Sequence, residues 1–421
     1  MRSLTIGLPI WTASQTQLAE DLSRLVEQAR ASMAARTLTA RTVRLTLPPV
    51  PAEVAQQPGA VASTLTAVQQ LASESGARWY CLPVNLVDGK NHAAVLAEVL
   101  NLLVKDQRLF VNLMVADETQ VSIAGARAAA EFVLNLSRRS HNGFDSFRVG
   151  VSCACCANMP FFPFSRHEGE SLAFSLALET TAPAIQALRE TPIRKSSLKA
   201  MRQALQACLR QEIRRADSFG RTLEASSGVV YKGLDGSYAP FPDGDTSIGS
   251  LVECFGVSPV GTNGTLFVTS VLTDTLRAAL RESDARCAGF NGVMYSVLED
   301  PTLASSNNLA SLSLEKLILF SALCGCGVDM APIPSTTYVE DVSAIILDVA
   351  ALAVRLAKPL GVRVVPIPNR QINEYVSFNQ DFLCDSRVMN PGISDSALFF
   401  TSSAVWQYLD APSPAGDKTP G

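Results

Sequence analysis

Hydrophobic residues follow two spacings that succeed each other along the chain. Between residues 14 and 35 they recur every three or four positions, as on one face of a helix. In 42–47 (TVRLTL) they alternate with polar residues, as in a strand that ends at Pro48. The same succession predicts further helices over 60–75, 92–105 and 121–136, and further strands over 79–84, 109–115 and 147–153.

Both spacings persist beyond residue 153. Helical spacing covers 170–189, 196–219, 247–254, 265–280, 314–324 and 339–357, and strand-like segments cover 228–232, 289–298 and 363–367. Because strands and helices alternate, the sequence predicts an α/β fold with a largely parallel sheet. We expect one domain over 1–410, with two halves that meet near 196–225. The segment 411–421 is rich in proline and glycine, so we expect a disordered tail there.

The composition fits a protein with a large core. Of the 421 residues, 47% are hydrophobic and 18% are charged, and the charged share lies below the usual value of about 25%. The net charge of -4 comes without a basic block, so no nucleic-acid partner is expected. No signal peptide or membrane span stands out, so we expect a cytoplasmic protein with reduced cysteines and no membrane partner. Sparse charge and apolar helices also predict a homodimer.

The segment 320–329 (FSALCGCGVD) holds the strongest candidate nucleophile. Cys324 stands where a predicted helix meets a glycine-rich turn, and Asp329 follows the turn. A thiol held on such a turn can be activated as a nucleophile. The alternative is a glycine cap with two buried thiols. A redox pair of Cys324 and Cys326 is a third reading, which the strained ring disfavours.

Several other polar residues follow predicted strands. His167 ends a proline-containing loop, where it can serve acid–base chemistry or simply begin a helix. Glu299 and Asp300 follow the strand predicted at 289–298, as a proton-transfer pair or as an acidic surface turn. Asp235 begins a turn-rich segment in which aspartates either bind a hard cation or are solvated.

Cofactor motifs are weak in this chain. Cys153 and Cys156 form a single C-x-x-C without a second pair, and the chain has only three histidines, so we expect no zinc site and no iron–sulfur cluster. The segment 261–264 (GTNG) is neither a Walker loop nor a dinucleotide fingerprint. We therefore expect no metal, and the cofactor is unknown.

Some of these segments together resemble a known family. The segments 160–167 (PFFPFSRH), 233–249 (GLDGSYAPFPDGDTSIG), 289–300 (GFNGVMYSVLED) and 321–334 (SALCGCGVDMAPIP) are similar to the family called domain of unknown function 711, or uncharacterised protein family 0210. The resemblance implies a ten-stranded α/β barrel like that of pyruvate formate-lyase and ribonucleotide reductase, with two five-stranded halves and a finger loop. No glycyl-radical motif stands near the C-terminus, so the radical chemistry is not expected.

Most of the candidate site residues stand at positions that are similar to the family, but the resemblance implies no particular activity, so their roles are expectations of an enzyme hypothesis. Catalytic roles are expected for Cys324, His167, Asp329 and Glu299. Substrate contacts are expected for Arg387, Asp235, Asp300 and Glu179, with Arg387 as an anion clamp. The sequence thus predicts an enzyme that acts on a small polar metabolite in a barrel pocket, with Cys324 as nucleophile or acid–base group. The alternative is a non-catalytic ligand-binding or regulatory protein that keeps the barrel.

Overall fold

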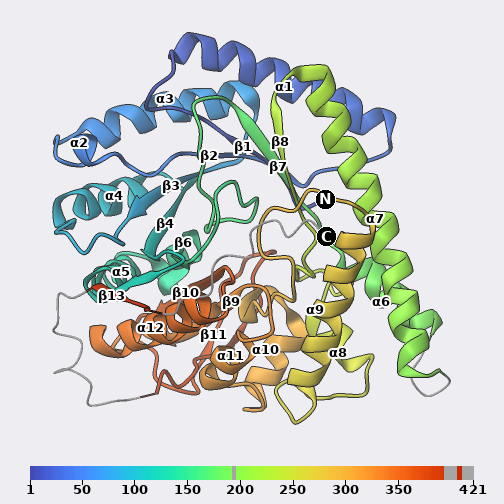
Figure 1. Ribbon diagram of the computed structural model, residues 1–421. Coiled ribbons are helices and arrows are strands. Elements are labelled where there is room, and N and C mark those ends of the chain that lie inside the picture. The colour runs from blue at the N-terminus through green and yellow to red at the C-terminus, as the bar shows by residue number, and fades with distance from the viewer. Residues whose placement is uncertain (192–195, 393–404, 410–421) are drawn as a thin grey trace.

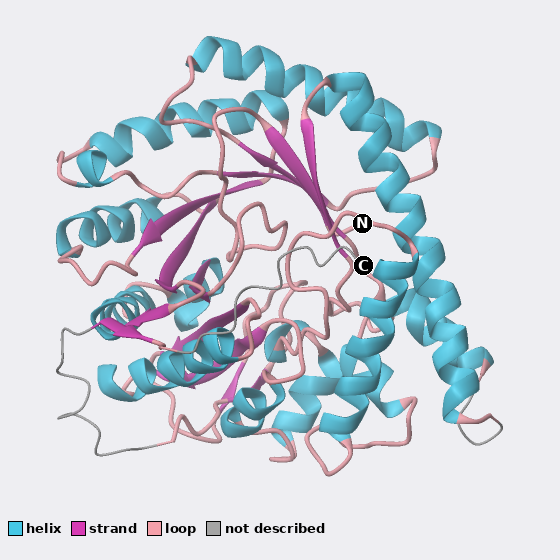
Figure 2. Ribbon diagram, in the orientation of Figure 1, coloured by secondary structure: helices cyan, strands magenta, loops and turns pink. Residues whose placement is uncertain are grey.

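The computed structural model describes residues 1–191, 196–392 and 405–409, and the predicted tail at 411–421 lies outside them. A curved sheet runs through the middle of the molecule and helices cover its outside (Figures 1 and 2). Its strand order is β8-β7-β1-β2-β3-β4-β6-β10-β9. The bounds are β1 (Ser3–Gly7), β2 (Thr42–Thr46), β3 (Trp79–Asn85), β4 (Leu109–Ala116), β6 (Val149–Cys153), β7 (Ala173–Ala177), β8 (Val230–Asp235), β9 (Gly327–Pro334) and β10 (Leu360–Ile367).

Strand direction changes at two places in this order. The strands β1, β2, β3, β4 and β6 are parallel to one another. The parallel pair β7–β8 lies antiparallel to β1, and the parallel pair β9–β10 lies antiparallel to β6. Along the chain, the reversal falls in the connection 154–172, between β6 and β7, rather than at 196–225. The predicted α/β class and largely parallel sheet are confirmed.

The segment 287–296 lies between the two outer strands of this order. One isolated parallel bridge pairs Leu234 of β8 with Cys287, and another pairs Ser296 with Asp329 of β9. The strand predicted over 289–298 is therefore reduced to single bridges, and a turn of 3-10 helix, Val297–Glu299, follows it. Gly289 and Asn291 have positive φ, which interrupts extended backbone and explains the missing ladder.

Helices cover the outer face where the hydrophobic spacing predicts them. Helix α1 begins after Ser14 and buries Leu18, Leu22 and Leu25 against the core, as predicted. No helix among the described residues combines the length and hydrophobicity that crossing a membrane requires. The bounds are α1 (Gln15–Ala35), α2 (Ala52–Ala55), α3 (Ala60–Ser75), α4 (Ala93–Lys105), α5 (Ile123–Ser137), η1 (His141–Arg148), α6 (Thr181–Glu190), α7 (Leu198–Ser227), α8 (Ile248–Glu253), α9 (Thr265–Glu282), α10 (Pro301–Asn308), α11 (Leu314–Phe320) and α12 (Val339–Arg355). The short strands are β5 (Gln120–Ser122), β11 (Tyr375–Val376), β12 (Ser386–Arg387) and β13 (Val405–Gln407).

One predicted helix is wrong. The segment 170–189 begins instead with strand β7, and only its second part forms helix α6. All five residues of β7 are buried, and the strand lies between β1 and β8, where neighbours on both sides take its backbone hydrogen bonds. Tertiary pairing therefore overrides the local helical spacing of this segment.

Candidate functional site

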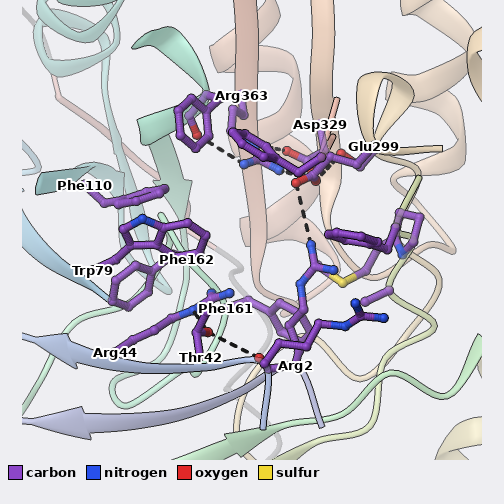
Figure 3. Close-up of a pocket in the computed structure, with 18 of the residues that line it drawn as sticks. Arg2, Thr42, Arg44, Trp79, Phe110, Phe161, Phe162, Glu299, Asp329 and Arg363 are labelled. Carbon is purple, nitrogen blue, oxygen red and sulfur yellow. Dashed lines mark hydrogen bonds and ion pairs between the residues drawn. The ribbon is translucent and has the colours of Figure 1, made fainter. Parts of the chain in front are cut away.

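A cavity of about 570 Å³ opens on the inner face of the sheet. Strands β2, β3, β4, β9 and β10 contribute residues to its wall, and the connections around 161–164, 239–241 and 380–382 complete it (Figure 3). Its volume falls within the usual range for small-ligand sites. Its lining combines five arginines, three carboxylates and an extensive aromatic surface: Arg2, Arg41, Arg44, Arg78, Arg363, Glu299, Asp329, Asp381, Trp79, Phe110, Phe147, Phe161, Phe162, Phe164, Phe241 and Phe382.

The alternation of strand side chains places charge on this inner face. In β2, Thr42 and Arg44 line the cavity, whereas the apolar residues between and after them pack into the core. The register pairs Arg44 with Trp79 of β3, so these two side chains are neighbours across the strands. In the same way Arg363 of β10 is paired with Asp329 of β9. Arginines that stand between apolar residues of these strands therefore face the cavity.

One wall of the cavity holds a buried ion-pair cluster. Arg363 donates to both oxygens of Asp329, at 2.6 Å from Nε and 2.9 Å from Nη2, and to Glu299 at 2.8 Å from Nη2. Ser296 donates to Glu299 at 2.6 Å. Asp329 and Arg363 are only 2% and 5% exposed, so each compensates for the loss of hydration of the other.

The cluster continues as a chain of alternating charges. Arg2 lies 3.7 Å from Glu299 and 3.0 Å from Glu179. Glu179 in turn pairs with Arg41 at 2.8 Å, near the cavity rim. The three arginines Arg2, Arg41 and Arg363 are thus each engaged by carboxylates of the protein itself.

Burial and neighbouring charges shift the pKa values of Asp329 and Glu299 in opposite directions. Burial raises the pKa of Asp329, and the Arg363 guanidinium only partly offsets this effect. Burial also opposes ionisation of Glu299, but Arg363 and Arg2 together bring the pKa of that carboxyl below its ordinary value. Two nearby carboxyl groups in different environments are a common arrangement for acid–base chemistry.

Arg44 differs from the other buried arginine of the cavity. Its Nε donates to the Thr42 hydroxyl at 2.9 Å, and its guanidinium lies 5.1 Å from the centre of the Trp79 ring and 5.2 Å from that of Phe162. No carboxylate of the described residues lies within 4.0 Å of it. Burial, and next the charge of Arg2, lower the pKa of Arg44 to about 9. Figure 3 shows Arg44 beside Trp79 and Phe162, away from the Arg363 cluster.

The structure brings together three of the residues predicted from sequence. Asp329 and Glu299 both contact Arg363 and line the cavity, and Glu179 reaches Glu299 through Arg2. These three positions, 179, 299 and 329, are far apart in the sequence, and Arg2 and Arg363 connect them.

Two carboxylates that were predicted to contact substrate lie outside the cavity lining and accept hydrogen bonds from backbone amides. Asp300 is the N-cap of α10, accepting from the amides of Thr302 and Leu303, and it also accepts from the Ser247 hydroxyl. Asp235 is fully buried at the end of β8 and accepts from the amides of Phe290 and Asn291. Both carboxylates thus fix turns rather than face the cavity.

Arg387 and His167 also lie away from the cavity. Arg387 is exposed on β12 and donates to the carbonyl of Asn373. His167 is buried against Gly7, and its Nδ1 lies 3.1 Å from the side-chain oxygen of Asn158. Burial lowers the pKa of His167 to about 4, so the ring is neutral at physiological pH.

Cys324 is completely buried in the main core and does not line the cavity. A hydrogen bond from Cys326 and the nearby charge of Lys358 bring the pKa of Cys324 to about 6, against the opposing effect of burial. Cys326 packs in a small apolar cluster with Met294 and Phe161, which do line the cavity. Cys326 therefore lies directly behind side chains of the cavity wall, whereas Cys324 packs in the main core.

Metal ligands do not gather among the described residues: no group of three His, Cys, Asp or Glu side chains is placed to hold an ion. All ten cysteines are free, and Cys156 and Cys287 are the exposed ones. The site residues that sequence reasoning missed are Arg2, Arg44 and Arg363. Their signal is an arginine beside a strand or between two apolar residues of a strand, as in TVRLT and LGVRVVPI.

Comparison with known proteins gives a family but no activity. A family model described as Uncharacterised ACR (DUF711) matches residues 9–381. A UPF0210 protein of Pyrobaculum arsenaticum is 26% identical over 257 residues, which cover 61% of this chain and 56% of that relative. A UPF0210 protein of Carboxydothermus hydrogenoformans is 22% identical over 403 residues, covering 90% of this chain and 88% of the relative. The matches to three Pyrobaculum relatives span 56% to 61% of their lengths.

Proposed function

The chain belongs to the family described as Uncharacterised ACR (DUF711), and from the geometry of its cavity we propose that it is an enzyme that binds a small anionic metabolite and transfers a proton through Glu299. The observation that carries the proposal is the ion-pair cluster in which Glu299, Asp329 and Arg363 face an aromatic cavity. Five arginines against three carboxylates in the lining favour an anionic ligand.

Glu299 is better suited than Asp329 to receive a proton from the ligand. Its side chain is 16% exposed, against 2% for Asp329, so it has more access to the cavity. Its lowered pKa keeps it ionised at neutral pH, as a general base must be. Arg363 holds both carboxylates, so a proton that arrives on Glu299 has Asp329, whose pKa is raised by burial, as a neighbour across one guanidinium.

The arrangement of strands supports a closed barrel as part of this proposal. The segment 287–296 makes parallel bridges to the outer strand pairs on both sides. Counted as a strand, it joins β7, β8, β9 and β10 in a second parallel group of five, antiparallel to the first. We propose that these two groups form the ten-stranded barrel that the resemblance to pyruvate formate-lyase implies.

Cys324 remains a second candidate for the chemistry. Its pKa of about 6 favours a thiolate at neutral pH, which is the nucleophilic form. Because the thiol is fully buried, this role requires the apolar layer around Met294 to move on ligand binding. A non-catalytic binding protein would use the same cavity without either step.

The substitution Glu299→Gln tests the proposal. Small molecules released from the denatured protein are identified by mass spectrometry and returned to the folded protein, and their conversion is followed. We expect Glu299→Gln to retain binding and to slow conversion at least 100-fold, in line with the usual contribution of a general base. Glu20→Gln, on the exposed face of α1, is the matched control and should convert normally.

Conversion by Glu299→Gln at the wild-type rate would contradict the proposed base. If Cys324→Ser alone abolished conversion, the thiol would take its place. If the wild-type protein bound the ligand and returned it unchanged, the binding-protein alternative would replace the enzyme.

A further inference from the structure

We propose that Arg44 binds the carboxylate of an aryl monocarboxylate, whose ring packs against Trp79, Phe110 and Phe162. The proposal rests on the proposed function and names the ligand class of that same cavity. It follows from one guanidinium that the protein buries in the cavity without giving it a carboxylate partner.

The lack of a partner is specific to Arg44 among the buried arginines of the cavity. Arg363 is equally buried, at 5% exposure, but engages two carboxylates. Arg2 and Arg41 share Glu179. Arg44 is 5% exposed, and its one hydrogen bond among the described residues uses Nε, which leaves its two Nη groups for another acceptor. Burying an uncompensated charge costs several kcal/mol, so a residue kept in this state points to an anion that arrives with the ligand.

The charge and shape of the Arg44 guanidinium favour a carboxylate over a phosphate. The planar guanidinium presents two parallel N–H donors that match the two oxygens of a carboxylate. The other arginines near this wall are already paired with carboxylates of the protein: Arg2, Arg41 and Arg363 with Glu179, Glu299 and Asp329. One uncommitted positive charge is balanced by one negative charge, whereas a phosphate dianion would leave a charge without a partner.

The surroundings of Arg44 favour an aromatic body for the same ligand. Trp79 is its cross-strand neighbour, and the Phe110 ring lies 5.2 Å from Trp79 and 5.5 Å from Phe162, centre to centre. Phe147 stands edge-on to Phe110 at 5.4 Å and also lines the cavity. An aryl ring gains both apolar burial and edge-to-face contacts on such a surface. The carboxylate at Arg44 then directs the rest of the ligand toward the Arg363 cluster on the other wall (Figure 3).

Calorimetric titration of the full chain tests the ligand class. The probes are benzoate, phenylacetate and indole-3-acetate, with benzamide and phenylacetamide as neutral analogues, phenyl phosphate as the dianion and acetate as the acid without a ring. We expect at least one aryl acid to bind at least tenfold more tightly than its amide, than phenyl phosphate and than acetate. Arg44→Met should remove the preference for acid over amide, and Arg44→Lys should keep part of it because the charge remains without the planar fork. Arg24→Met, an exposed arginine on α1, is the control and should behave as wild type.

Thermal unfolding separates this role from a structural one. Without ligand, Arg44→Met should have a Tm equal to or above that of the wild type, because a buried charge without a partner is removed. A lower Tm together with unchanged acid binding would show a structural residue and overturn the proposal. Tighter binding of phenyl phosphate, or no binding of any aryl acid, would also overturn it. Neither result bears on Glu299, whose role is tested by turnover of the co-purified ligand.

Discussion

Arg44 and Arg363 show how the same residue type serves two purposes at one cavity. Each stands between two apolar residues of a strand, and each is buried on the inner face of the sheet. Arg363 meets Asp329 because the register of β9 and β10 pairs them, whereas the residue paired with Arg44 is Trp79. The sequence shows both arginines, but only the register distinguishes the compensated charge from the uncompensated one.

The substitution Arg363→Met should destabilise the protein by about 3–5 kcal/mol, because it leaves Asp329 and Glu299 buried without their shared cation. The loss should shrink as the pH falls, since the two carboxyl groups can then bind protons. Urea unfolding at several pH values measures both effects. Arg24→Met on the exposed side of α1 should change stability by no more than about 0.5 kcal/mol. A pH-independent loss would argue against the ion-pair account.

His167 should make stability depend on pH in acid. The folded protein keeps the pKa of His167 near 4 by burial, whereas the ordinary value is 6.5. The unfolded chain therefore binds more protons between these values, and stability falls as the pH drops from 6.5 to 4. The difference of about 2.5 units corresponds to about 3 kcal/mol. In His167→Gln this part of the slope should disappear, and an unchanged slope in urea titrations would contradict the assignment.

At the scale of elements, most helices could be predicted because their apolar spacing is long and regular, as in α1 and α12. The strands were predicted less completely than the helices. β9 was missed because Pro332 and Pro334 suggest a turn, yet prolines are tolerated where the strand ends the sheet order. β7 is five residues long and was hidden in a helical pattern. In both cases, pairing with the neighbouring strands of the sheet determines that the segment forms a strand.

The connection between β6 and β7 depends on small residues in the strands beneath it. A Cβ added at Gly361 of β10 would stand 2.2 Å from the ring of Phe164, which is buried and lines the cavity. Gly361→Ala should therefore destabilise the protein by about 1–3 kcal/mol and weaken ligand binding. The double variant Gly361→Ala with Phe164→Leu should recover part of the stability, as measured by urea unfolding. Equal stabilities for wild type and Gly361→Ala would show that the loop does not pack as described.

For the whole molecule, the sequence was sufficient for the family and the α/β class, but it identified only part of the site. Glu299 and Asp329 were found because they stand at the edges of recognisable motifs. Cys324 was favoured by the same motif, yet the fold encloses it in the core. The aromatic and arginine lining comes from many separated segments, and no single motif records that they converge. The predicted homodimer stays a prediction, and sedimentation against the chain mass of 44.9 kDa will decide it.

The most direct measurement of the account is a crystal structure of the full chain with the tightest-binding aryl acid from the titration series. We expect ligand density in the cavity, with the carboxylate within hydrogen-bond distance of both Nη atoms of Arg44, the ring against Trp79 and Phe162, and the remainder toward Glu299. Density at Cys324 or Arg387, with the cavity empty, would contradict it.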